Sequence, residues 1–288
     1  KKVEALPFMP ILSPLRCEWV TPNDINSIDS LRVVTYNLLS DSNAGQEGSA
    51  AYLYPQCDPE HLLRKRRMPM IIYELLAYQA DLICLQEVDM LVYDTLLRPV
   101  LSDKGYQGFY SNKIGNTREG CAMFWSLDRF EALTEDEPQT FPIRDLFPLG
   151  KNEDQSGFLE DWTSVVDMKN LLEAHDDLRE MIEDKLGHVL QIATLTLKNG
   201  ERVGSMAMPS KILVANTHLY YHGMAGHIRL MQLLMACYCI EKERCKDGER
   251  YPFVFAGDFN SAVRSGAVQL MLRRTVGPTG STWKHLHS

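Results

Sequence analysis

Five residues of the sequence could serve one chemistry: Asn37, Glu87, His218, Asp258 and Asn260. They stand at the ends of apolar or β-branched runs, in VVTYNLL, ICLQEVD, VANTHLY and FAGDFN. Carboxylate and amide oxygens are hard ligands that suit Mg²⁺ or Mn²⁺ better than zinc, and Mg²⁺ often takes only one or two protein carboxylates. A histidine beside such an ion can stabilise charge on a phosphoryl oxygen. These residue types therefore fit metal-assisted hydrolysis of a phosphodiester.

Each residue also has a simpler interpretation when it is taken alone. An Asn after a strand is commonly a turn residue, and the Asp of GDFN can bond its own backbone in a turn. Glu87 could be the first solvated residue of a loop, and His218 could be a hydrogen-bonded core histidine. The recurrence at four strand ends favours a shared site, because neighbouring strand ends of layered α/β folds meet at one crevice.

The elements that must position these residues follow from the hydrophobic pattern. Strands are expected at residues 31–40, 81–89, 105–111, 120–127, 188–198, 211–222 and 251–260. Helices are expected at 59–80, with a kink or a restart at Pro69, and at 228–243. Residues 134–187 form an acidic insert, expected to contain an irregular segment and one charged helix. Strands alternating with helices predict a layered α/β domain, and no glycine-rich nucleotide-binding motif is present.

Composition narrows the class of protein. The chain has 288 residues, 45% of them hydrophobic, and a net charge of −8, which argues against a surface that coats nucleic acid generally. RNA stays open as a substrate because a metal ion can neutralise phosphate locally. Seven cysteines without CxxC spacing predict reduced thiols, an intracellular protein and no zinc site. No apolar run reaches ~20 residues, so neither a membrane span nor a membrane partner is expected.

The two ends of the chain carry expectations of their own. Residues 1–30 contain four prolines and are expected to form an extended lead-in to a domain at residues 31–288. The first residue is Lys1 rather than Met, so we expect a fragment or a processed protein, with any targeting segment out of view.

Five stretches carry a family resemblance by their order: TYNLL, LICLQEVD, REGCAMFW, ANTHLYYH and FAGDFNS. They resemble the exonuclease–endonuclease–phosphatase superfamily from about residue 31 to about residue 283, weakly over 134–187. The sequence is most similar to the RNA-directed branch, which comprises cytoplasmic deadenylases, nocturnin, Angel proteins and 2′,5′-phosphodiesterases. YPQCDP at 54–59 and HLYYHGMAGHIRLMQ at 218–232 favour the 2′-phosphodiesterase subgroup.

The resemblance implies a four-layer α/β sandwich with two facing mixed sheets and a site at one rim. It implies that Asn37 and Glu87 position Mg²⁺, or Mn²⁺ in its place, with Glu87 as the main carboxylate ligand. His218 would contact the scissile phosphate, Asp258 would orient or deprotonate the attacking water, and Asn260 would hold a phosphoryl oxygen. Further contacts to the substrate or the metal shell are expected from Glu119, Tyr221, His222 and Arg229.

Two elements that close the family's site do not occur in the sequence: a strand with a DYI-like motif, and a near-terminal SDH whose Asp–His pair performs acid–base catalysis. His285 and His287 stand near the end, but no acidic residue precedes them. We therefore expect the native chain to continue, and the chain as it stands to lack the C-terminal strands and leave a sheet edge uncovered. Its activity should be impaired, because an acid–base group typically supplies about 10²–10⁴-fold.

Two functions are therefore in competition. The first is a Mg²⁺-dependent RNA phosphodiesterase, a 3′ exoribonuclease acting on oligo(A) tails or on 2′,5′-oligoadenylate. The second is a catalytically impaired homologue that serves as a structural subunit or assembly factor of a ribonucleoprotein, whose partners cover the open edge. A phosphoinositide phosphatase or a DNA-repair endonuclease of the same superfamily is a further alternative. The resemblance implies a mitochondrial location, with the cytoplasm as the alternative.

Overall fold

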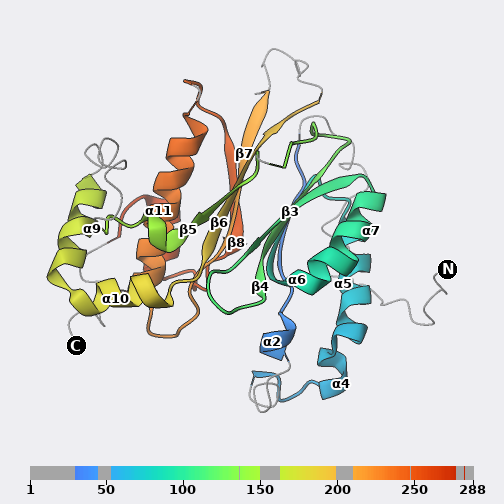
Figure 1. Ribbon diagram of the computed structural model, residues 1–288, viewed down its shortest axis with the longest axis horizontal. Coiled ribbons are helices and arrows are strands. Elements are labelled where there is room, and N and C mark those ends of the chain that lie inside the picture. Colours follow the sequence, from blue (N-terminus) through green and yellow to red (C-terminus); the bar gives the residue numbers. More distant parts are fainter. Residues whose placement is uncertain are drawn as a thin grey trace.

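Two four-stranded sheets face each other in the described part of the computed structural model (Figure 1). That part comprises residues 30–44, 53–135, 137–149, 163–198, 210–246, 248–276 and 282, so the expected lead-in lies outside it except for Ser30. The first sheet has the order β1 (Val33–Asn37), β2 (Leu82–Asp89), β4 (Glu119–Ser126), β3 (Tyr106–Asn112). The second has the order β5 (Gln139–Pro142), β6 (Val189–Thr196), β7 (Lys211–His218), β8 (Phe253–Asp258).

Both sheets are mixed, with β1–β2 and β7–β8 parallel and the other neighbours antiparallel. Helices cover the outer faces (Figure 1). The first sheet carries α5 (Arg64–Tyr78) and the continuous segment α6 (Met90–Val92), η2 (Tyr93–Leu97) and α7 (Arg98–Asp103). The second carries η3 (Ile143–Leu146), α9 (Thr163–Ala174), α10 (Asp176–Lys185) and α11 (Gly226–Arg244). Within the described residues, the remaining helices are α2 (Asp41–Ala44), α4 (Pro59–Leu62) and α12 (Gly266–Arg273). The predicted four-layer α/β sandwich is confirmed.

The central strands are apolar throughout because both of their faces are buried. In β2, Ile83 and Leu85 pack against α5, while Leu82 and Cys84 face the second sheet. The same alternation places Leu195 of β6 between the sheets. The six cysteines within the described residues form no disulfide. No helix in this part of the chain is long and apolar enough to cross a membrane.

Polar side chains also cross the space between the sheets, in a cluster we call the amide bridge: Gln86, Asn216 and Gln191. Gln86 Nε2 donates to Asn216 Oδ1 at 2.8 Å, and Asn216 Nδ2 donates to Gln191 Oε1 at 3.0 Å. All three side chains are buried, with at most 1% exposure. Asn216 Nδ2 also donates to the carbonyls of Leu85 and Ala122 in the opposite sheet. The amide bridge fixes one sheet against the other, because a shift would leave buried polar groups unpaired.

The structure corrects the expected restart of the helix at Pro69. Helix α5 continues through Pro69, and the chain is interrupted at Leu63, where ψ is 136°. The Leu63 carbonyl accepts from the N–H groups of Arg66 and Arg67 and so begins the second helix. The buried face of α5, with Met68, offsets the ladder bond that the proline cannot make.

The acidic insert also differs from its expectation of an irregular segment and one helix. Its described part contains strand β5, the 3₁₀ turn η3 and two helices, α9 and α10. β5 pairs with β6 and completes the second sheet at that side, so it is part of the sandwich. It escaped notice because it has four residues and ends in Pro142, which suits a sheet edge but weakens a strand pattern.

Candidate active site

The ends of β1, β2, β7 and β8 meet at one rim of the sandwich, where β1 leads toward α2 (Figure 1). Asn37 ends β1, and its Nδ2 donates to Glu87 Oε1 at 3.0 Å and to Asp258 Oδ2 at 2.9 Å. His218 and Asp258 are register partners at the ends of β7 and β8. Asn260 follows two residues later, and its Nδ2 lies 2.9 Å from His218 Nε2. The five residues singled out in the sequence are thus brought together from both sheets.

Glu87 occupies a β-bulge in β2. Gln86 pairs with Cys121 and Val88 pairs with Gly120, so Glu87 has no partner of its own in β4. Its φ of 53° lies in the left-handed region, which is uncommon for a residue with a side chain and is often found at functional sites. The bulge turns the carboxylate into the rim, in keeping with the use of bulges to re-aim side chains.

Three N–H groups hold the Glu87 carboxylate. Besides Asn37, Ser40 N donates to Oε2 at 3.0 Å and Asn43 Nδ2 donates to Oε2 at 2.6 Å. Burial alone would raise the pKa of this carboxyl, but these hydrogen bonds bring the pKa below its ordinary value. Glu87 is therefore an anion whose orientation is fixed by its surroundings.

Asn37 spans the gap between the two sheets. Its amide nitrogen bonds carboxylates of β2 and β8, while its Oδ1 accepts from Leu39 N at 2.9 Å. In this arrangement the amide oxygen is directed to the backbone, so Asn37 would serve a metal site by orienting Glu87 and Asp258.

His218 and Asn260 form a pair at the edge of the rim. Asn260 Nδ2 donates to the Leu219 carbonyl at 2.8 Å and to His218 Nε2, which therefore accepts. Burial and the nearby Lys113 lower the pKa of His218, although the carboxylates of Asp258 and Glu87 oppose this. The imidazole is accordingly neutral, with Asp258 Oδ2 at 4.0 Å from Nε2.

The GDFN stretch is shaped by its backbone. Gly257 has φ +150°, and a Cβ on it would collide with the Thr217 carbonyl oxygen of the neighbouring strand. Asn260 has φ 46°, and its N–H donates to Asp258 Oδ1 at 2.9 Å. The Asp-to-backbone turn that the sequence allowed is therefore present. It coexists with the site, because Asp258 Oδ2 is still directed to Asn37.

Glu119 begins β4 and is 7% exposed. Its Oε1 accepts from Lys113 Nζ at 2.6 Å, and its Oε2 has no hydrogen-bond partner among the described residues. Lys113 follows β3 across the same hairpin and was not anticipated. His188, another unanticipated residue, lies with its ring centroid 6.4 Å from that of His218. Burial, with the charge of Lys113, lowers the pKa of His188 to about 3.

The other three expected substrate residues lie on the loop after β7 and at the start of α11. The Tyr221 side chain is 75% exposed. The ring of His222 accepts from Met224 N at 3.3 Å and stacks on Tyr220. Arg229 is 8% exposed and donates to the carbonyls of Tyr220 and His222. Arg229 therefore holds this loop in place, and Tyr221 and His222 are both exposed to solvent.

The donor set can be tested against a divalent metal. No group of three or more His, Cys, Asp or Glu side chains in the described ranges is arranged to hold a metal ion. The rim offers instead one fixed anionic carboxylate, and Glu87 Oε1 accepts a single hydrogen bond and so keeps acceptor capacity. Mg²⁺ commonly binds through one or two carboxylates, with water and phosphate completing its shell. Glu87 therefore fits Mg²⁺ or Mn²⁺, and Glu119 Oε2 is a further unpaired buried oxygen nearby.

Comparison with known proteins decides the family. The model of the endonuclease/exonuclease/phosphatase family matches residues 34–288. The chain belongs to this family. Enzymes of the endonuclease/exonuclease/phosphatase family are hydrolytic phosphodiesterases and nucleases that generally use divalent metals, so a hydrolase is supported at this general level. The resemblance seen in the sequence is confirmed.

Relatives within the family agree with the expected branch. Human 2′,5′-phosphodiesterase 12 is 31% identical over 254 residues, which are 88% of this chain and 37% of that protein. Mouse protein angel homolog 2 is 32% identical over 230 residues, which are 80% of this chain and 34% of that protein. The chain thus spans well under half the length of these curated relatives.

Solved structures of the family share the fold. The structure of ANGEL2, a 2′,3′-cyclic phosphatase, has a TM-score of 0.61 at 27% identity, covering 84% of this chain and 56% of that chain. The human nocturnin catalytic domain has a TM-score of 0.54 at 21% identity, covering 84% of this chain and 69% of that chain. The second likeness supports the fold alone.

Proposed function

We propose that this chain is a phosphodiesterase that depends on Mg²⁺ or Mn²⁺ and hydrolyses RNA, with oligo(A) tails or 2′,5′-linked oligoadenylate as its substrates. The observation that carries the proposal is the Glu87 carboxylate, which a bulge and three N–H donors fix at the rim where both sheets meet. The similarity to 2′,5′-phosphodiesterase 12 supports the substrate class.

Each residue has a task that its contacts support. Glu87 would hold the metal ion, which when bound supplies Lewis-acid stabilisation of phosphoryl charge. Asp258 is 31% exposed at its side chain and has solvent access, so it would orient or deprotonate the attacking water. Asn260 Nδ2 already donates to His218 Nε2 and to the Leu219 carbonyl, so its amide would donate to a phosphoryl oxygen by giving up the bond to His218. Tyr221 would stack on a base, since its ring is exposed.

The test uses the full-length protein with labelled 2′,5′- and 3′,5′-linked adenylate oligomers, with Mg²⁺, with Mn²⁺ and after chelation. We expect hydrolysis that requires the metal, and Glu87→Ala should lower it by about 10³-fold, equivalent to several kcal/mol of lost stabilisation. Glu131→Ala is the matched control, because this exposed carboxylate lies outside the rim. Equal hydrolysis by Glu87→Ala and the unaltered protein would contradict the proposal.

A second candidate function is a structural subunit or assembly factor of a ribonucleoprotein. The observation that favours it is β8, which has no further partner strand among the described residues and is largely half-exposed, with Phe253 43% exposed. Purification of the full-length protein from cells distinguishes the two candidates. Stable association with RNA and protein, together with no hydrolysis, would support the second candidate, whereas a monomeric active protein would remove its basis.

A further inference from the structure

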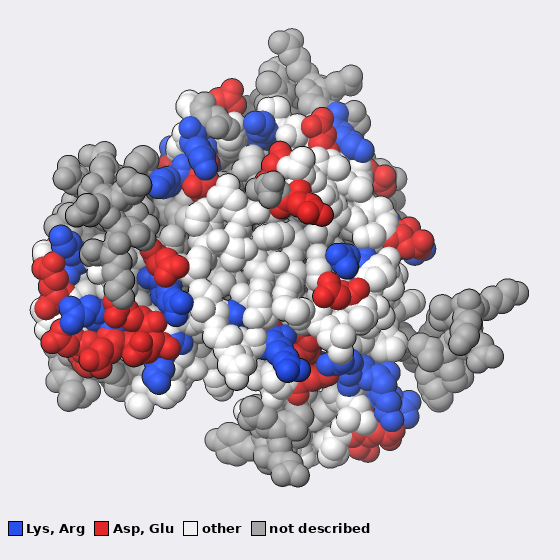
Figure 2. All heavy atoms as spheres, viewed as in Figure 1, with Lys and Arg blue, Asp and Glu red and all other residues white. Residues whose placement is uncertain are grey.

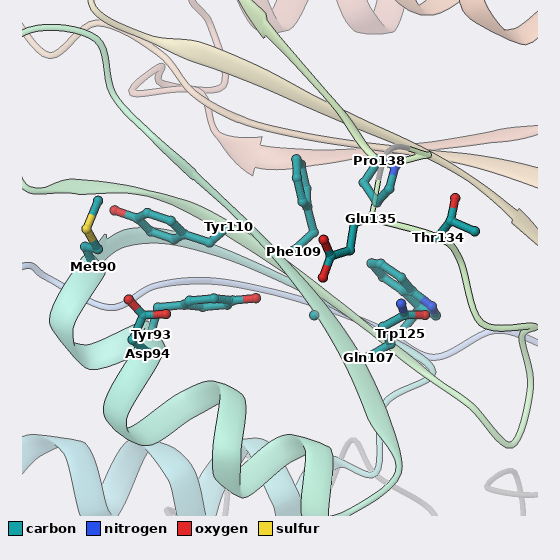
Figure 3. Close-up of a pocket in the computed structure, with 11 residues that line it drawn as sticks. Met90, Tyr93, Asp94, Gln107, Phe109, Tyr110, Trp125, Thr134, Glu135 and Pro138 are labelled. Carbon is teal, nitrogen blue, oxygen red and sulfur yellow. The ribbon is translucent and has the colours of Figure 1, made fainter.

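A cavity of about 410 Å³ lies along β3, at the end of the first sheet that is opposite β1 (Figure 3). Its lining comes from β3, β4, the α6–η2 segment and the residues just before β5. Four aromatic side chains are among the lining residues, and two of them, Tyr93 and Trp125, are largely buried: Tyr93, Phe109, Tyr110 and Trp125. We call this cavity the β3 groove. It is separate from the rim that holds Glu87, and none of the residues proposed for hydrolysis lines it.

The main chain of β3 forms the floor of the β3 groove. β3 pairs with β4 on one side, and no described residue pairs with its other side. Gly108, in the middle of the strand, lines the cavity with its main chain, and a Cβ on it would collide with the Phe124 ring. Outward-facing N–H and C=O groups of an edge strand are a template for another strand. The floor therefore offers main-chain hydrogen bonds to an extended segment.

The walls of the β3 groove lie on both faces of the strand. Figure 3 shows Tyr93 and Tyr110 on the helix side, with their rings stacked at 5.0 Å, and Phe109 and Trp125 on the other side. Successive side chains of an added strand point to opposite faces. Alternate side chains of a bound segment would therefore enter the two aromatic walls in turn.

The charged residues of the β3 groove favour some kinds of ligand over others. Its charged lining residues are both acidic, Asp94 and Glu135. Asp94 lies 3.5 Å from Arg98, whereas Glu135 is exposed and extends over the cavity between Phe109 and Trp125 (Figure 3). Figure 2 shows the middle of this view largely uncharged, with both acidic and basic groups around it. A carboxylate beside aromatic faces attracts a Lys or Arg side chain by charge and by cation–π contact, and it repels phosphate.

We propose that the β3 groove binds an extended peptide segment of a partner protein, in which apolar and basic residues alternate. The segment would pair with β3 through its main chain, as in other cases of β-strand addition. Its basic side chains would lie on the side of Glu135, and its apolar side chains would pack on Tyr93 and Tyr110. The groove does not suit RNA, and a second copy of this chain would bring like charges together.

The test measures fluorescence anisotropy of a labelled octapeptide of alternating valine and arginine with the full-length protein. We expect saturable binding of this peptide. A valine–glutamate peptide should bind at least about tenfold more weakly because it lacks the favourable charge, and a valine–arginine peptide N-methylated at alternate amides should bind at least about tenfold more weakly because it cannot pair through its main chain. Amide hydrogen exchange of residues 106–112 should slow when the peptide binds. Glu135→Lys should weaken binding about tenfold, and Glu131→Lys, an exposed carboxylate outside the lining, less than about twofold.

Several outcomes would overturn the proposal. These are absence of saturable binding, equal binding of the N-methylated peptide, and an unchanged affinity in Glu135→Lys. Oligo(A) that displaces the peptide and slows exchange in residues 106–112 would make the groove a nucleic-acid surface instead. Dimerisation that slows exchange in the same residues, without peptide binding, would make it a self-association surface. Hydrolysis by Glu135→Lys should equal that of the unaltered protein, so this test is independent of the proposed function.

Discussion

Replacement of Asn216 by leucine tests the amide bridge between the two sheets. Leucine has the same branching as asparagine, with two methyl groups in place of Oδ1 and Nδ2, and it can neither donate nor accept. The change removes the donor to Gln191 Oε1 and the acceptor for Gln86 Nε2, and both groups are buried. Gln86 Nε2 keeps the Cys84 carbonyl as an acceptor at 3.0 Å, whereas Gln191 Oε1 has no other hydrogen-bond donor within the described residues. The larger loss therefore falls on Gln191.

The magnitude follows from these contacts. A buried polar group left without its partner costs about 1–3 kcal/mol, and the Leu85 and Ala122 carbonyls each lose a donor as well. We expect Asn216→Leu to lower the free energy of unfolding by about 3 kcal/mol. That is a large share of the stability of a typical domain, about 5–15 kcal/mol. The rate of hydrolysis should fall too, because Gln86 precedes Glu87 and Asn216 lies two residues before His218.

Urea unfolding followed by tryptophan fluorescence and circular dichroism gives the free energy, with Trp125 buried in the core. Gln191→Met serves as the second mutation of a double-mutant cycle. Replacing both partners by apolar side chains should restore part of the loss, so the double variant should be more stable than the sum of the single effects by about 1 kcal/mol or more. A loss under about 1 kcal/mol for Asn216→Leu, or strict additivity in the cycle, would refute this reasoning.

Three further predictions concern other parts of the chain. Gln79 is exposed and has φ 47° after α5, so Gln79→Gly should raise the free energy of unfolding by about 0.5–1 kcal/mol in urea, and a decrease would contradict it. Burial lowers the pKa of His188 to about 3, whereas the ordinary pKa of histidine is about 6.5. Between these two pH values the folded protein binds fewer protons than the unfolded chain, so the free energy of unfolding decreases as the pH falls from about 6.5 toward 3. Urea unfolding at pH 7 and pH 4.5 should therefore show a decrease in the free energy of unfolding that is about 2 kcal/mol smaller for His188→Gln than for the unaltered protein. The control His61→Gln, at an exposed position, should show the same decrease as the unaltered protein. Lys113→Met leaves the buried Glu119 carboxylate unpaired and should lower the free energy of unfolding by about 3–5 kcal/mol. The double variant with Glu119→Gln should recover much of this loss. If it does not, the result would argue against the ion pair.

The strands that carry the site could be predicted because each is a run of apolar residues that stops on a polar one. That pattern indicates a buried segment and the point at which burial ends, and Glu87 and Asp258 stand at such points. The approach of the two carboxylates to Asn37 was expected from the fold class. The individual hydrogen bonds, and the direction of the Asn37 amide, depend on the spacing of the two sheets, which a sequence does not encode locally.

Other features escaped prediction for physical reasons. Gln191 and Asn216 lie on the expected strands, but their pairing depends on how one sheet is aligned on the other. Lys113 reaches Glu119 only because the β3–β4 hairpin places the two residues across from each other. The helical segment after β2 contains Pro99, which interrupts the helical signal; in the structure α7, where it stands, follows the π-helical turn η2 directly.

The bulge means that Glu87, which carries the proposed chemistry, is not needed for the pairing of β2 with β4. The partners on either side, Cys121 and Gly120, are consecutive in β4, so Glu87 is an additional residue that the ladder does not require. Deletion of this single residue would let Gln86 and Val88 pair in an uninterrupted register and would relieve a left-handed backbone conformation. A lineage could therefore lose catalysis in one deletion and retain the sandwich as a binding module.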